Sequence, residues 1–107
     1  MPREVRIEHH YPQAQAFLVA HGQQGVIVLH ALLQDADERG GVIVASGSSR
    51  TLAARTELVS KDTVHRQLMS LQRAGILQRV PSDDSRSPSY VVHLDDLGIT
   101  VAFPHHS

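Results

Sequence analysis

The amino-acid sequence predicts a mainly α-helical domain that carries one small β-hairpin. Three observations support this fold class. Two helical segments, each introduced by a serine, follow one another within residues 49–74. The second segment repeats aliphatic residues at Val64, Leu68 and Leu71, which is the i, i+4, i+7 spacing of a buried helix face. Two β-prone runs then follow, separated by a loop rich in serine, aspartate and proline.

Length and composition indicate one globular domain over residues 1–107. A chain of 107 residues has room for one modest core, and 41% hydrophobic with 20% charged residues is an ordinary globular composition. The absence of cysteine excludes a disulfide framework and a cysteine-based zinc site. No run approaches the roughly 18 uninterrupted apolar residues of a membrane span, and a signal peptide is not evident. We therefore expect a cytoplasmic protein with no membrane partner.

The formal charges are distributed unevenly along the chain. Residues 48–90 contain seven Lys or Arg and four Asp or Glu, whereas the remainder contains three and seven, for a net charge of −1. Affinity for DNA comes largely from cations that displace counterions at phosphates. A positive segment on an otherwise acidic chain is therefore compatible with a localised DNA-binding surface.

The amino-terminal part predicts two helices, over residues 12–21 and 23–36. Pro12 suits the first helical position, and Gly22 follows the last residue of the first helix. A short apolar run at 42–45, after a pair of glycines, predicts a brief strand.

The central part predicts two consecutive helices with serine caps. Ser49 is the expected N-cap of a helix of about two turns that extends through Thr56. Ser60 repeats this signal, and the helix over about 60–74 stops at Gly75.

The carboxyl-terminal part predicts β-structure. We expect strands at 76–80 and 89–94, joined by the polar loop 81–88. The segment 98–104 predicts one more strand or an extended arm.

The run from Ser49 to Leu77 contains four recognisable motifs, which are Leu52-Ala53, Ser60-x-x-Thr63-Val64-x-Arg66, Leu68-x-x-Leu71 and Ala74-Gly75-Ile76-Leu77. With these motifs it resembles bacterial winged helix-turn-helix regulators of the MarR and GntR types, and the winged domains of plasmid replication initiators. The resemblance covers about residues 42–94. It implies a winged helix-turn-helix fold, with the helix at about 60–74 as the recognition helix and the loop at about 81–88 as the wing.

The turn between the two helices departs from this pattern. Glu57 or Leu58 stands where these families usually have glycine. A left-handed residue other than glycine costs about 1 kcal/mol, so we expect a differently built turn with Leu58 or Val59 inserted toward the core.

Helix geometry sorts the side chains of the predicted recognition helix. With the aliphatic stripe facing the core, Asp62, Arg66 and Arg73 point outward. We expect Lys61, Asp62, His65 and Arg66 to contact bases. Arg66 is suited to bidentate pairing with guanine, Asp62 to accepting from the cytosine amino group, and Lys61 to guanine or phosphate.

Other polar residues are suited to the DNA backbone. Hydroxyls and backbone N–H groups at helix starts commonly hold phosphate oxygens. The helix starts contribute Ser49, Arg50, Ser60 and Thr63. The hairpin contributes Arg79, Ser85, Arg86 and Ser87. These features together predict sequence-specific binding of double-stranded DNA, as in a transcription regulator.

Two other functions remain open at this point. A winged helix also serves as a protein-interaction module in larger assemblies, which the net charge of −1 and the aspartates of the wing favour. A DNA-binding accessory role in plasmid replication or transfer fits the same resemblance. An enzyme is not expected, because no phosphate loop or activated nucleophile is evident. The eight histidines are scattered without metal-site spacing, so no metal or cofactor is expected.

A homodimer would allow two recognition helices to reach successive half-sites on DNA. The sequence offers two surfaces for it, the amino-terminal helix with Phe17 and Leu18 and the segment 99–103. Either segment can instead complete the core of a monomer.

Overall fold

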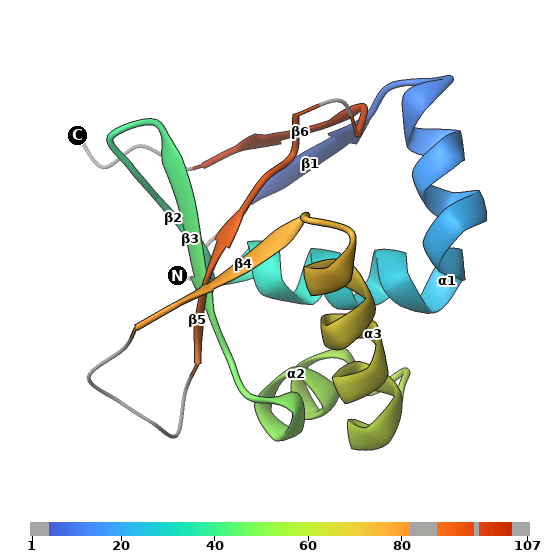
Figure 1. Cartoon of the computed structure of the whole chain (residues 1–107), viewed down its shortest axis with the longest axis vertical. Helices are drawn as coiled ribbons and strands as arrows, with labels where there is room; N and C mark the ends of the chain where they lie inside the picture. Colours follow the sequence, from blue (N-terminus) through green and yellow to red (C-terminus); the bar gives the residue numbers. More distant parts are fainter. Residues whose placement is uncertain (1–4, 82–87, 96, 104–107) are drawn as a thin grey trace.

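The computed structural model describes residues 5–81, 88–95 and 97–103, and within them it contains three helices and two antiparallel sheets (Figure 1). The fold is therefore mixed α/β, and the prediction of a mainly α-helical chain was wrong in its share of β-structure. The elements are β1 (Arg6–His9), α1 (Gln13–Gln34), β2 (Asp37–Arg39), β3 (Val42–Ser46), α2 (Ser49–Thr56), α3 (Lys61–Arg73), β4 (Leu77–Val80), β5 (Ser89–Val92) and β6 (Ile99–Ala102).

The larger sheet has four antiparallel strands in the order β2-β3-β5-β4. The predicted hairpin is present as β4 and β5, with Leu77 opposite Val92 and Val80 opposite Ser89. The predicted strand β3 pairs with β5, and β2 extends the sheet beyond it. The sequence prediction missed β2, because all three of its residues are exposed and show no alternation of apolar and polar side chains.

The smaller sheet pairs the two ends of the described chain. The strand β6 confirms the strand alternative for the carboxyl-terminal segment, and it pairs with β1, which the sequence prediction missed. Gly98 precedes β6 with φ of 69°, and a Cβ atom there would collide with the carbonyl oxygen of His10. Only glycine fits this close approach of the two chain segments.

Helix α1 comprises the two predicted helices, which are separated by a kink at Gly22. Gly22 interrupts it with φ of 74° and ψ of 176°, at the position that the sequence marked as a helix end. The helix begins one residue later and ends two residues earlier than predicted. Figure 1 shows its two segments at a large angle to each other.

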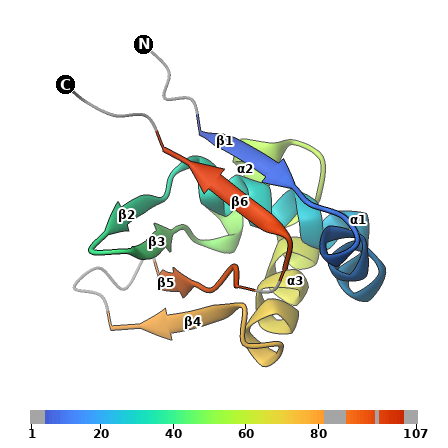
Figure 2. The ribbon, with the colours of Figure 1, turned by 90° about the horizontal axis from the view of Figure 1, so that it is seen from above.

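The core lies between the second segment of α1, the helices α2 and α3, and the strands. Figure 2 shows the helices on one side and the four-stranded sheet on the other. The fully buried large side chains are Val28, Leu29, Leu32, Leu33, Leu52, Val64 and Leu71. Phe17 and Ile99 are also buried in this core, so they are not available as the dimer contacts that the sequence offered.

By length and composition, α1 is the one helix of the described residues that could span a membrane, with a mean hydropathy of 1.5. Its second segment packs into the protein core, and Gly22 bends it. Of the apolar window that passes this test, 39% is buried inside the protein.

The turn between α2 and α3 differs from the expectation that its non-glycine residues would avoid the left-handed conformation. Glu57 adopts the left-handed conformation with φ of 56°, and its N–H donates to the carbonyl oxygen of Ala53 at 3.0 Å. The prediction that a non-glycine residue would avoid this conformation was wrong, because the capping hydrogen bond offsets part of a cost of about 1 kcal/mol. Val59 packs against the core as expected, whereas Leu58 is exposed.

The stability of the fold is expected to decrease at acidic pH through His30 in α1. Its Nε2 lies 2.9 Å from the Nε2 of His9 in β1. Burial lowers the pKa of His30 from its ordinary value of 6.5, and the charge of His9 lowers it further. The unfolded chain therefore binds a proton more readily, so the free energy of unfolding falls as the pH decreases below 6.5.

Thermal unfolding between pH 7.5 and pH 5.5 is the measurement for this prediction, with His30→Gln as the comparison. The loss of stability over this window is expected to be smaller in the variant. An equal loss in both proteins would contradict the role of His30.

Candidate nucleic-acid interface

Serine caps fix the starts of the two helices that form the candidate interface. The Oγ of Ser60 accepts from the backbone N–H of Thr63 at 3.2 Å, which confirms the predicted cap of α3. At α2 the cap is Ser48 rather than the predicted Ser49, since the Oγ of Ser48 accepts from the N–H of Thr51 at 3.1 Å. Ser48 has the extended backbone that an N-cap requires, and Ser49 is already helical.

Replacement of the two adjacent serines separates these assignments. Ser48→Ala is expected to lower the free energy of unfolding by about 1 kcal/mol, because it removes a capping hydrogen bond. Ser49→Ala is expected to have a much smaller effect. Chemical denaturation measures both values, and a larger loss in Ser49→Ala would contradict the cap seen here.

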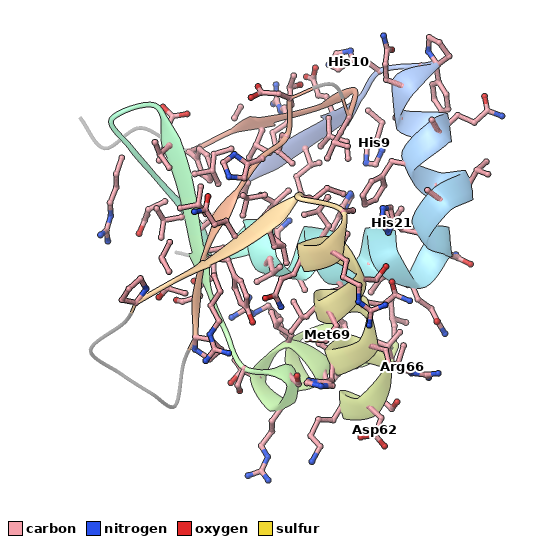
Figure 3. The ribbon with its side chains drawn as sticks, viewed as in Figure 1. His9, His10, His21, Asp62, Arg66 and Met69 are labelled. Atoms are coloured by element: carbon pink, nitrogen blue, oxygen red, sulfur yellow. The ribbon has the colours of Figure 1, made fainter. Side chains whose placement is uncertain are left out.

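Helix α3 has one buried face and one exposed face, as the sequence predicted. Val64, Leu68 and Leu71 are buried against the core. The exposed residues are Lys61, Asp62, His65, Arg66, Met69 and Arg73. Figure 3 shows Asp62 and Arg66 projecting from α3 away from the body of the protein. The outward direction predicted for Asp62, Arg66 and Arg73 is confirmed.

Thr63 differs from its predicted role as a phosphate contact. It is buried at 9% exposure, and its Oγ1 accepts from the Oγ of Ser60 at 3.0 Å. The same oxygen accepts from Nη2 of Arg66 at 3.4 Å. The Thr63 hydroxyl therefore takes part in the internal hydrogen bonding at the start of α3, on the buried side of the helix.

A recess of about 290 Å³ lies between α3, the start of α2 and the β4–β5 hairpin. It brings together the predicted site residues Ser49, His65 and Arg79, which come from three different elements. Its described lining is completed by Ser48, Leu68, Met69, Gln72, Pro88 and Tyr90. The sequence prediction placed Met69 beside the outward face of the helix but did not include it among the DNA contacts. In the structure Met69 lines the recess. Its position one helical turn after His65 could have indicated this.

Tyr90 also lines the recess, and it is the cross-strand partner of Arg79 in the pairing of β4 with β5. Burial raises the pKa of Tyr90, while the guanidinium of Arg79 opposes part of this effect. Its hydroxyl is therefore neutral at physiological pH and adds no negative charge to the recess.

The exposed cations of this region lie on elements that border the recess or the outer face of α3. They are Arg50, Lys61, Arg66, Arg73 and Arg79. Arg55 is different, because its Nη1 donates to the carbonyl oxygen of Ala31 and its Nη2 lies 3.5 Å from Oδ2 of Asp35. It connects α2 to α1 and does not belong to the interface, although the sequence counted it in the positive segment.

The remaining predicted contacts fall in the hairpin loop. Ser85, Arg86 and Ser87 lie outside the described residues, so their contribution stays a prediction.

Comparison with known proteins identifies no relative of this chain. The chain matches no protein-family model, no curated protein and no solved structure. The functional conclusion consequently depends on the geometry and charge of α3 and the elements beside it.

Proposed function

We propose that this chain is a winged-helix domain that binds double-stranded DNA sequence-specifically, most simply as a transcription regulator. In this proposal α3 enters the major groove, and the β4–β5 hairpin is the wing. The observation that carries the proposal is the two-faced character of α3. Its aliphatic side packs on the core, while its first two turns present Lys61, Asp62, His65 and Arg66 to solvent.

The chemistry of these side chains is suited to reading base edges. An α-helix fits the major groove, and residues near its amino terminus reach the bases. Arg66 carries a guanidinium that matches O6 and N7 of guanine, and Asp62 accepts from the cytosine amino group. Met69 adds an apolar side chain one turn later, which is suited to a thymine methyl group.

The cations beside α3 supply the contacts to phosphate. Arg50 lies at the start of α2 and Arg79 on the hairpin, so backbone contacts would flank the groove that α3 occupies. Neutralising three or four phosphates would make log K fall with log salt at a slope of about −3 to −4.

A salt titration with a random-sequence pool of duplex DNA tests this proposal. Fluorescence anisotropy is expected to show binding that weakens steeply between low and physiological salt. An absence of binding at low salt would overturn the proposal. That result would favour the second function, a winged-helix protein-interaction module, for which the formal net charge of −1 is the supporting observation.

A further inference from the structure

Two histidines from distant parts of the chain meet between β1 and α1. The Nε2 of His9, the last residue of β1, lies 2.9 Å from the Nε2 of His30 in the second segment of α1, and the ring centroids are 5.1 Å apart. His9 is exposed and His30 is half-buried, so the pair is open to solvent. The two residues are 21 positions apart, which explains why the sequence showed no metal-site spacing.

The elements around this pair carry few formal charges. From His9 to Gln34 the sequence contains no Lys, Arg, Asp or Glu, and β6, the partner strand of β1, contains none either. A cation bound by the pair would therefore meet no like charge on α1 or β6. Among the described residues, no third His, Asp or Glu joins the two histidines as a possible ligand. Water would consequently fill the other coordination positions of such an ion.

We propose that His9 and His30 bind a divalent transition-metal ion that accepts ligands at right angles, Ni²⁺ or Cu²⁺. Neutral imidazole nitrogens are suited to both ions and to Zn²⁺. With metal–nitrogen bonds of about 2.0–2.1 Å, two ligands at a right angle are about 2.9 Å apart, whereas two ligands of a tetrahedral ion are about 3.3 Å apart. The separation of 2.9 Å between the two Nε2 atoms matches the right angle, so Zn²⁺ is the poorer fit.

The ion replaces the hydrogen bond between the two rings. In that bond one Nε2 carries a proton and the other accepts it. When the ion binds, the donating imidazole loses this proton to solvent and gains one at Nδ1, so both Nε2 lone pairs face the metal and no net proton is released. The ion then joins β1 to α1. Because the two histidines come together in the folded chain, binding raises the free energy of unfolding.

Isothermal titration calorimetry with Ni²⁺ tests this site. All proteins in the test carry His105→Gln and His106→Gln, which remove an adjacent histidine pair that could bind the ion by itself. This parent chain is expected to bind a single Ni²⁺, and to bind it more tightly than Zn²⁺. His9→Gln and His30→Gln are each expected to weaken binding at least about tenfold, since removal of a group that only supports a ligand already costs about 10- to 100-fold.

His10→Gln is the matched control, because His10 is the neighbour of His9 but its Nε2 lies 3.0 Å from the Oγ1 of Thr100. It is expected to bind Ni²⁺ as the parent does. Thermal unfolding gives a second readout, in which Ni²⁺ raises the midpoint of the parent and of His10→Gln but not of His9→Gln or His30→Gln. The inference is independent of the proposed function, since no DNA is present.

Three results would overturn the proposal. The first is a parent chain that does not bind Ni²⁺, and the second is tighter binding of Zn²⁺ than of Ni²⁺. The third is a loss of binding in His10→Gln equal to the losses in His9→Gln and His30→Gln, because the pair seen here does not include His10.

Discussion

The double variant Lys61→Ala, Arg66→Ala is expected to bind duplex DNA about a hundredfold more weakly than the wild-type chain. Each cation that contacts a base or phosphate contributes about 1–3 kcal/mol, and 1.4 kcal/mol corresponds to a factor of ten. Both side chains are exposed at the start of α3, and neither packs in the core. The variant is therefore expected to unfold at nearly the wild-type temperature, so that lost binding reports lost contacts.

A second double variant controls for net charge. Arg6→Ala, Arg39→Ala removes two exposed cations from β1 and β2, away from α3. Exposed charges beyond about 10 Å are largely screened at physiological salt, so we expect a loss of less than about threefold. Anisotropy titrations of the three proteins give the comparison. Equal losses in both variants would indicate a general charge effect and would contradict specific contacts by α3.

Leu71→Ala is expected to lower the free energy of unfolding by about 2–5 kcal/mol, a large part of the roughly 5–15 kcal/mol of a domain this size. Leu71 is completely buried between α3 and the rest of the core. Its truncation removes apolar contacts and leaves a cavity, and the surrounding side chains are closely packed.

Met69→Ala is the matched control in the same helix. Met69 is 40% exposed on the opposite face, so its truncation is expected to change stability by about 0.5 kcal/mol or less. Urea denaturation followed by circular dichroism measures both variants. Similar losses in the two would contradict the assignment of a buried and an exposed face to α3.

The parts of the fold that the sequence predicted are those with strong local signals. The spacing of Val64, Leu68 and Leu71 placed the buried face of α3, and Ser60 marked its start. Gly22 marked the break in α1 because its backbone has a positive φ that glycine adopts at little cost. These signals come from residues close together in the sequence, so the helix boundaries and the buried face can be predicted without knowledge of the tertiary contacts.

The parts that were missed depend on contacts between distant segments. β1 pairs with β6 at the other end of the described chain, and β2 pairs with β3 and has no apolar pattern of its own. The sequence counted Arg55 among the cations of the positive segment, whereas in the structure its guanidinium donates to the carbonyl oxygen of Ala31 in α1. The sequence predicted Thr63 as a phosphate contact, whereas in the structure its hydroxyl accepts a hydrogen bond from the Oγ of Ser60.

The central claim is that the outer surface of α3 and the recess beside it form the DNA-binding site. Amide chemical shifts of the ¹⁵N-labelled chain, recorded during titration with a duplex selected from a random pool, locate the contact directly. The account predicts that the largest changes occur at Ser60–Arg66, at Ser48–Arg50 and around Arg79. Changes confined to α1 or the β1–β6 sheet, or no changes at saturating DNA, would contradict it.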